Sequence, residues 1–189
     1  MQDKQISRFP IPSVDELPAD IKKHIYAIQE KIGFIPNVLL TLSYRPDEFR
    51  AFMAYHDALM ERKGGLTKAE KEMIIFVTSN QNGCQYCVIA HGAILRVRAK
   101  DPLIADQVAI NYRKADISSR QKAMLKFALK VSNDSRSISD EDFENLSPHG
   151  FNEDDIWDIA SITAFFGLSN RIANYTSMRP NPEFYLMGR

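Results

Sequence analysis

Apolar residues recur every three or four positions along most of the 189-residue chain, which is the period of an amphipathic α-helix. Ile21, Ile25, Ile28 and Ile32 show this pattern, and Gly33 follows them where a helix C-terminus favours glycine. No segment alternates convincingly with the period of two that a strand requires. The sequence therefore predicts an all-α protein, with helices over residues 19–32, 46–62, 68–81, 84–98, 102–112, 119–132 and 153–177.

The remaining segments connect these helices. Residues 1–17 are rich in proline and are expected to lie extended over the surface or over a neighbouring subunit. Residues 34–40 form a short apolar connector, and Ser139 opens a short acidic helix whose charges suit a helix N-terminus. We expect the whole chain, 1–189, to form one domain.

Two capping signals precede the most apolar helices. Thr67 with Glu70 forms one capping box, and Asn152 with Asp155 has the same spacing. Each signal follows an amphipathic helix, so residues 46–98 and 119–177 are interpreted as an internal repeat. Chance similarity between capped amphipathic helices is the alternative explanation.

Charge and composition narrow the range of partners. The chain has 24 Lys and Arg against 24 Asp and Glu, so its charge gives no reason to expect nucleic acid or an anionic membrane. No apolar run approaches the roughly 20 residues of a membrane-spanning helix, and the N-terminus lacks the apolar core of a signal peptide. We therefore expect a reducing cytoplasm, where a Cys-x-x-Cys pair is more typical of catalysis or metal binding than of a structural disulfide.

The candidate chemistry lies around the two cysteines of the chain. Cys84 and Cys87 stand at the start of the predicted helix 84–98, where free N–H groups and the positive dipole end favour a thiolate. His91 follows four residues after Cys87 and shares its helix face. A thiolate that attacks a peroxide bond becomes a sulfenic acid, and a second thiol one turn away can condense with it to a disulfide.

Glu72 and His91 are the candidates for moving protons. Glu72 stands in an apolar run, where an unpaired carboxylate is costly, so we expect His91 to be its partner across the intervening turn. Glu72 would then orient His91, and His91 would exchange a proton with a thiol, directly or through water. Two alternatives stay open. The thiols could be inert and Glu72 could lie at the surface, or Glu72, His91 and both cysteines could bind zinc.

The combined pattern Glu-x11-Cys-x2-Cys-x3-His, from Glu72 to His91, resembles the signature of the alkyl hydroperoxidase D-like (AhpD-like) family, within the carboxymuconolactone decarboxylase superfamily. Residues 169–174 are similar to a segment of its peroxidase-related branch. The resemblance implies an all-helical fold with a duplicated core, a homo-oligomer (dimer, trimer or hexamer), and reduction of small hydroperoxides with an external dithiol or dihydrolipoyl-type reductant. It also implies that Cys87 is oxidised, and that Cys84 is the outer thiol that resolves it and meets the reductant.

Other residues have less specific expectations. Known family members carry a His where this chain has Tyr86, which is expected to form a pocket wall or to act as a weak proton donor. His56 is expected in the core, with a place in the wall of the active site as the alternative, and His24 is expected in solvent. The aromatic residues of the last long helix are expected in the core or at a subunit interface: Trp157, Phe165 and Phe166.

Apolar surface gives a second reason to expect a homo-oligomer. The helices 68–81 and 156–168 are apolar on more faces than one layer of neighbours would bury. Asn170 and Arg171 are expected to pair with acids at such an interface or to reach toward the site. No cofactor is expected. Two other functions remain open: a carboxymuconolactone decarboxylase-type enzyme, which needs no pair of thiols, and a redox-sensing oligomer that forms a disulfide without turnover.

Overall fold

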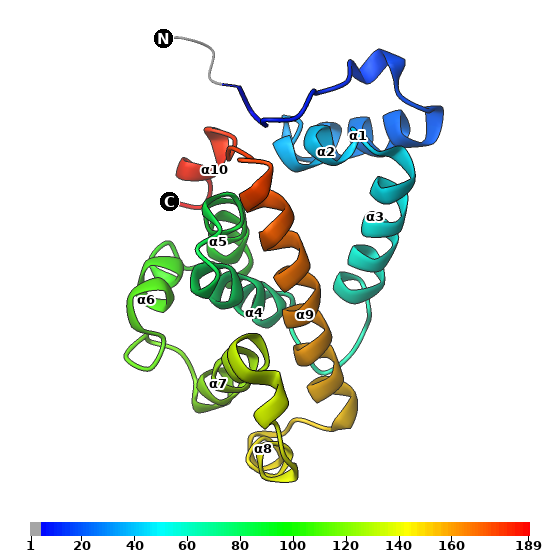
Figure 1. Cartoon of the computed structure of the whole chain (residues 1–189). Coiled ribbons are helices and arrows are strands. Elements are labelled where there is room, and N and C mark those ends of the chain that lie inside the picture. The colour runs from blue at the N-terminus through cyan, green and yellow to red at the C-terminus, as the bar shows by residue number, and fades with distance from the viewer. Residues whose placement is uncertain (1–4) are drawn as a thin grey trace.

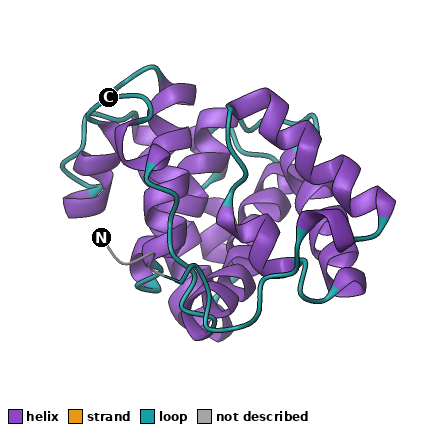
Figure 2. Ribbon diagram, turned by 90° about the horizontal axis from the view of Figure 1, so that it is seen from above, coloured by secondary structure: helices purple, strands orange, loops and turns teal. Residues whose placement is uncertain are grey.

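The computed structural model describes residues 5–189, and within this range the chain is helical with no strand (Figure 2). The all-α prediction is therefore confirmed. Met1–Lys4, part of the predicted extended segment, lie outside the described residues. The helices are α1 (Ala19–Ile32), α2 (Asn37–Leu42), α3 (Pro46–Met60), α4 (Lys68–Gln81), α5 (Gln85–Ala99), α6 (Ile104–Asn111), α7 (Ser119–Asp134), α8 (Asp140–Glu144), α9 (Glu153–Tyr175) and α10 (Glu183–Leu186).

Helix α4 lies at the centre of the molecule (Figure 1). It packs against α5, α6, α7 and α9, and every residue from 70 to 79 is buried. Other helices of the same chain thus cover the apolar faces of α4. The prediction that α4 keeps an apolar face for a second subunit is therefore wrong, whereas the homo-oligomer itself stays a prediction. Helix α9 differs, because Trp157 and Leu168 on it are 73% and 52% exposed. Trp157 therefore does not lie in the core of this chain, and the alternative expectation, a subunit interface, stays a prediction.

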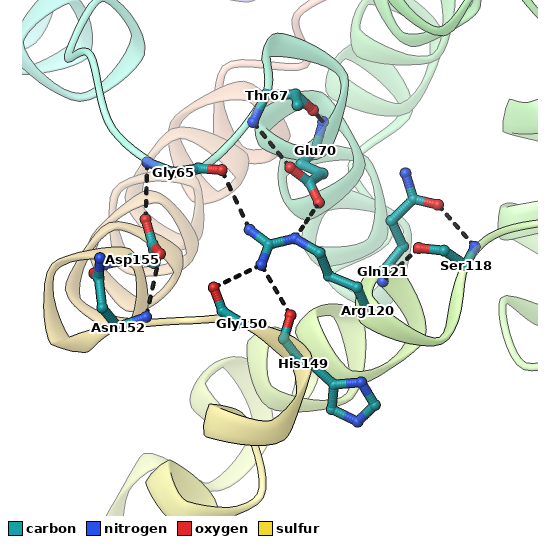
Figure 3. A network of polar contacts seen from close by, with 10 residues as sticks. All are labelled: Gly65, Thr67, Glu70, Ser118, Arg120, Gln121, His149, Gly150, Asn152 and Asp155. Carbon is teal, nitrogen blue, oxygen red and sulfur yellow. Dashed lines mark hydrogen bonds and ion pairs between the residues drawn. The ribbon is translucent and has the colours of Figure 1, made fainter.

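Capping boxes fix the beginnings of α4, α7 and α9. Those of α4 and α9 form at the residues that the sequence predicted, and α7 begins with a third box made by Ser118 and Gln121. Figure 3 shows that Gly65 and Arg120 link the capping carboxylates of α4 and α9 to neighbouring segments. The N–H of Gly65 donates to Asp155 Oδ1 at 2.9 Å, and Arg120 Nε of α7 donates to Glu70 Oε1 at 3.0 Å.

Some element boundaries differ from those expected. Helix α6 begins at Ile104 rather than at 102, because Asp101 Oδ1 accepts the N–H of Leu103 at 2.8 Å and holds a turn there. The connector predicted over residues 34–40 runs into helix α2, and a 3₁₀ turn, Val14–Glu16, interrupts the extended segment. The sequence did not predict α10, which the buried Arg96 secures by donating to the carbonyls of Phe184 and Met187.

The N-terminal helices α1, α2 and α3 form a separate apolar cluster, and α3 packs on α9. The segment before them lies against the end of α9, where the N–H of Arg8 donates to Thr176 O at 2.8 Å. Helices α1, α2 and α3, together with α5, α9 and α10, line a cavity. The cysteines lie beside this cavity, at the start of α5.

Candidate functional site

The two cysteines face each other across the first turn of α5. Cys84 is the N-cap residue, and its sulfur accepts the N–H of Cys87 at 3.3 Å. The two sulfur atoms are 2.7 Å apart, and neither is in a disulfide. Cys84 is 0% exposed and Cys87 is 2% exposed. The expectation that Cys84 is an outer thiol is therefore not met in this reduced form.

The two thiols share a proton unequally. Hydrogen bonding between the two sulfur atoms is the largest cause that lowers the pKa of Cys84. Burial opposes it, and the Cys87 N–H and Asn170 act in the same direction as the sulfur contact. The contact with Cys84, followed by burial, raises the pKa of Cys87 well above its ordinary value. The thiolate that the helix start favours is therefore expected at Cys84, while Cys87 keeps the proton.

Glu72 and His91 lie next to each other, as the sequence predicted. Glu72 is 2% exposed, which excludes a surface carboxylate, and its Oε2 is 2.8 Å from His91 Nδ1. With Glu72 ionised, Nδ1 carries the hydrogen, so Nε2 offers a lone pair. The sequence missed a third member, because Arg98 Nη1 lies 3.5 Å from Glu72 Oε1. The buried Glu72 carboxylate thus has two partners, the His91 ring and the Arg98 guanidinium, which offset the cost of burying its charge.

Asn170 of α9 lies beside the site, which is one of the two places that the sequence left open for it. It is fully buried, its Nδ2 donates to Ser79 Oγ at 2.9 Å, and its Oδ1 accepts from Asn82 Nδ2 at 2.9 Å. Hydrogen bonding from Asn170 also lowers the pKa of both thiols. Of the two expectations for this residue, the one toward the site is the one that the structure bears out. A polar residue late in an apolar helix was the available signal.

The cavity beside the cysteines has a volume of about 300 Å³. Cys87 and His91 line it, but Cys84 does not. His56 lines it as well, with Nδ1 2.9 Å from the neighbouring Asp57 carboxylate. The placement of His24 in solvent was wrong, because its ring lines the same cavity and its Nε2 is buried. A larger surface hollow, about 430 Å³ between α7 and α8, contains no cysteine and lies outside this site.

Tyr86 forms part of the cavity wall. Its hydroxyl oxygen accepts the N–H of Val38 at 3.3 Å, which leaves its own hydrogen free to donate. Burial, as the largest cause, raises the pKa of Tyr86 far above its ordinary value. The hydroxyl therefore stays protonated at any pH near neutrality and can donate a hydrogen bond, but it cannot relay a proton as a histidine would.

The described residues offer neither a metal-binding cluster nor a membrane-spanning helix. Within residues 5–189, no three His, Cys, Asp or Glu side chains come together in an arrangement that could hold a metal ion. In the same range, no helix combines the length and the apolar character needed to span a lipid bilayer.

Comparisons with known proteins agree with this architecture. Residues 46–111 match the model of the carboxymuconolactone decarboxylase family. The structure of a protein from Ralstonia eutropha JMP134, described as an alkylhydroperoxidase AhpD core and an uncharacterized peroxidase-related protein, is 63% identical, with a TM-score of 0.97 over 98% of this chain and 97% of that one. A peroxidase-related protein from Silicibacter sp. TM1040 is 40% identical, with a TM-score of 0.93 over 100% and 99%. Curated proteins gave no significant match.

A more distant structure shares the fold alone. The debrominase Bmp8, solved with 2,3,4-tribromopyrrole, is 21% identical, with a TM-score of 0.74 over 97% of this chain and 95% of that one. Fold and site together define an all-helical protein with a buried dithiol. The chain belongs to the AhpD-like, peroxidase-related proteins of the carboxymuconolactone decarboxylase family.

Proposed function

We propose that this protein is a thiol-dependent peroxidase that reduces organic hydroperoxides at Cys87. One observation carries the proposal: Cys87 and His91 line the same cavity, and Cys84 lies directly behind Cys87 with the sulfur atoms 2.7 Å apart. A substrate in the cavity would meet an oxidisable sulfur and a proton carrier together. The resolving thiol would already be in place.

In the first step, the Cys87 sulfur attacks the terminal oxygen of the hydroperoxide. An S–O bond forms, the O–O bond breaks, and Cys87 becomes a sulfenic acid. The thiol proton of Cys87 passes to the alkoxide oxygen, with His91 Nε2 as the carrier, and the alcohol leaves. Glu72 holds the His91 ring and stabilises its protonated form during the transfer.

In the second step, Cys84 attacks the sulfur of the sulfenic acid. The lowered pKa of Cys84 supplies a thiolate for this attack. A disulfide forms, and the departing hydroxide takes a proton, relayed from solvent by His91, to become water. An external dithiol or dihydrolipoyl-type reductant then reduces the disulfide by exchange and becomes oxidised itself. Cys87, which lines the cavity, is the sulfur that such a reductant would reach without opening the fold.

Hydroperoxide consumption with a dithiol in excess tests this proposal. We expect Cys87→Ser to abolish turnover. Without the dithiol, Cys84→Ser should consume one equivalent of hydroperoxide and keep a sulfenic acid that a diketone reagent traps and mass spectrometry detects. His91→Gln should lower kcat/KM by about 10²–10⁴-fold, the usual contribution of a positioned acid–base group. Retained turnover in Cys87→Ser would contradict the assignment.

The same assay separates the remaining alternatives. A redox sensor would form the disulfide once and show no steady turnover with excess reductant. A decarboxylase-type enzyme would convert a lactone acid in a double variant that lacks both cysteines.

A further inference from the structure

A second hollow lies between α7 and α8, the two helices at the lower end of Figure 1. Its volume of about 430 Å³ is within the range of ligand pockets, and it shares no lining residue with the cavity beside the cysteines. A ligand bound there would leave the cysteines free. Its binding therefore does not depend on the proposed peroxidase function.

Positive charge gathers in the wall of this hollow. Lys122, Lys126 and Lys130 line it, and they follow one another at intervals of one turn on one face of α7. Arg113, in the turn after α6, lines it too, with its guanidinium over the Tyr112 ring at 4.9 Å. The hollow thus brings four cations from two segments of the chain together.

Within residues 5–189, only one of these four cations has an acidic partner. Lys130 donates to both oxygens of Asp142, the single acid in the wall, at 2.6 and 2.8 Å. No ion pair of the described chain includes Lys122, Lys126 or Arg113. Like charges one turn apart repel, so such a row of lysines lowers the stability of the helix that carries it. An anion in the hollow would offset this repulsion.

The beginning of α7 adds to the positive field. Ser119, the first residue of this 16-residue helix, lines the hollow together with Lys122 one turn later. The Ser118 hydroxyl accepts the N–H of Gln121 at 3.1 Å. The N–H groups of the two residues between them have no partner within the helix and can bind an anion. An anion near Lys122 would therefore also meet the positive end of the helix dipole.

The floor of the hollow is apolar. Phe127 of α7 and Leu146, which follows α8, are buried and line it. A ligand therefore meets an apolar surface and, along one side, a row of ammonium groups. Lysine binds phosphate as a point charge, and a row of such charges matches a chain of phosphates better than a single carboxylate.

We propose that this hollow binds an oligophosphate, with its phosphate groups along Lys122 and Lys126 and against the start of α7. Two kinds of molecule carry such a chain, namely a nucleoside triphosphate and an inorganic polyphosphate. The apolar floor gives a nucleoside a surface to pack on, whereas an inorganic chain would use the cations alone. Comparing the affinities of the two kinds of molecule therefore distinguishes them.

Titration calorimetry of the full chain at low salt, in a buffer without phosphate or magnesium, tests the proposal. We expect ATP and inorganic tripolyphosphate to bind, AMP to bind at least about tenfold more weakly than ATP because it lacks the chain, and added salt to weaken all binding. Lys122→Met should raise the Kd of tripolyphosphate about fivefold, whereas Lys122→Arg, which keeps the charge, should change it little. Lys23→Met removes an equal charge from an exposed position of α1 outside the hollow, and should leave the Kd unchanged.

The affinities also identify the source of the phosphate chain. If ATP binds more tightly than tripolyphosphate, the floor holds the nucleoside and the ligand is a nucleotide. If tripolyphosphate binds as tightly as ATP or more tightly, the phosphate chain alone is recognised. Three results would overturn the inference: no binding of either compound at concentrations up to about 1 mM, AMP binding as tightly as ATP, or equal changes of the Kd in Lys122→Met and Lys23→Met.

Discussion

Helices α4 and α9 lie side by side, and polar groups join them at both ends, but the two ends differ in kind. At the N-terminal ends, the capping carboxylates Glu70 and Asp155 each close their own box and accept one more hydrogen bond from another segment (Figure 3). At the C-terminal ends, Asn170 of α9 joins Ser79 and Asn82. Only this second group affects the cysteines, because hydrogen bonding from Asn170 also lowers the pKa of both thiols.

The difference teaches how one helix pair can serve two purposes. The N-terminal network consists of helix-end groups that would be orphaned without a partner, so its role is to stabilise the fold. Even Gly65 fits this role, because a Cβ there would overlap the Asp155 carboxylate. The C-terminal network places an amide beside two buried sulfurs and changes their pKa values. Variants at each end should therefore affect different measurements.

The largest effect is expected at Arg120. Its guanidinium donates to Glu70, to the carbonyls of Gly65, His149 and Gly150, and lies over the Phe151 ring at 3.7 Å. Arg120→Met would leave the buried Glu70 carboxylate without its cation, and should lower the free energy of unfolding by about 3 kcal/mol. Urea denaturation, monitored by circular dichroism, measures the free energy of unfolding.

The matched control for this variant is Lys126→Met. Lys126 is an exposed cation on the same helix α7, so its loss should change the stability little. A loss in Arg120→Met of less than about 1 kcal/mol would mean that the arginine behaves as an ordinary surface ion pair. The thiol titration of Arg120→Met should match the wild type.

A smaller cost in stability, combined with a chemical effect, is expected at Asn170. Asn170→Ala leaves Ser79 and Asn82 without their buried partner and should cost about 2 kcal/mol. It also removes a hydrogen bond that lowers the pKa of each thiol, so both pKa values should rise. The rate of thiol alkylation against pH measures this change. Asn133→Ala, at an exposed position of α7, is the control; an alkylation profile in Asn170→Ala that matches it would contradict the role.

The sequence could predict what depends on local spacing. The capping boxes at Thr67 and Asn152 are four-residue patterns, and a Cys-x-x-Cys followed by a His four residues later describes one face of one helix. The pairing of Glu72 with His91 needed one further step, namely that a buried carboxylate requires a partner. The structure confirms these predictions about where the capping residues, the cysteines, Glu72 and His91 lie.

Contacts that depend on packing between distant segments could not be predicted. Asn170 reaches the cysteines only because α9 lies along α4, and Arg98 reaches Glu72 only through the register of α5 on α4. His24 lines the cavity because α1 folds back toward α5. The exposure of Trp157 has a similar origin, since the pattern of apolar residues alone cannot tell which face of a long helix its neighbours cover.

The two thiols should titrate in separate steps. As the pH rises, Cys84, whose pKa is lowered, should lose its proton first, and Cys87, whose pKa is raised, should lose its proton only at distinctly alkaline pH. Because each sulfur is the main cause of the other's shift, single variants should act in opposite directions. In Cys87→Ser the pKa of Cys84 should rise toward its ordinary value, and in Cys84→Ser the pKa of Cys87 should fall. Ultraviolet absorbance of the thiolate measures the pKa of the remaining cysteine in each variant. Shifts of the same sign in the two variants would contradict the idea that the two thiols share one proton.

The smallest effect is expected at the helix caps. The Thr67 hydroxyl accepts the N–H of Glu70 at 3.1 Å, so Thr67→Ala should lower the free energy of unfolding by about 1 kcal/mol, while Thr67→Ser, which keeps the hydroxyl, should cost less. Asn152→Ala removes the equivalent bond in α9 and should cost a similar amount. None of these variants should change the thiol titration, because the caps lie at the opposite end of the helix pair. A shifted titration in Thr67→Ala would show that strain at the cap reaches the cysteines along α4, and the two ends would then form one coupled unit rather than two independent ones.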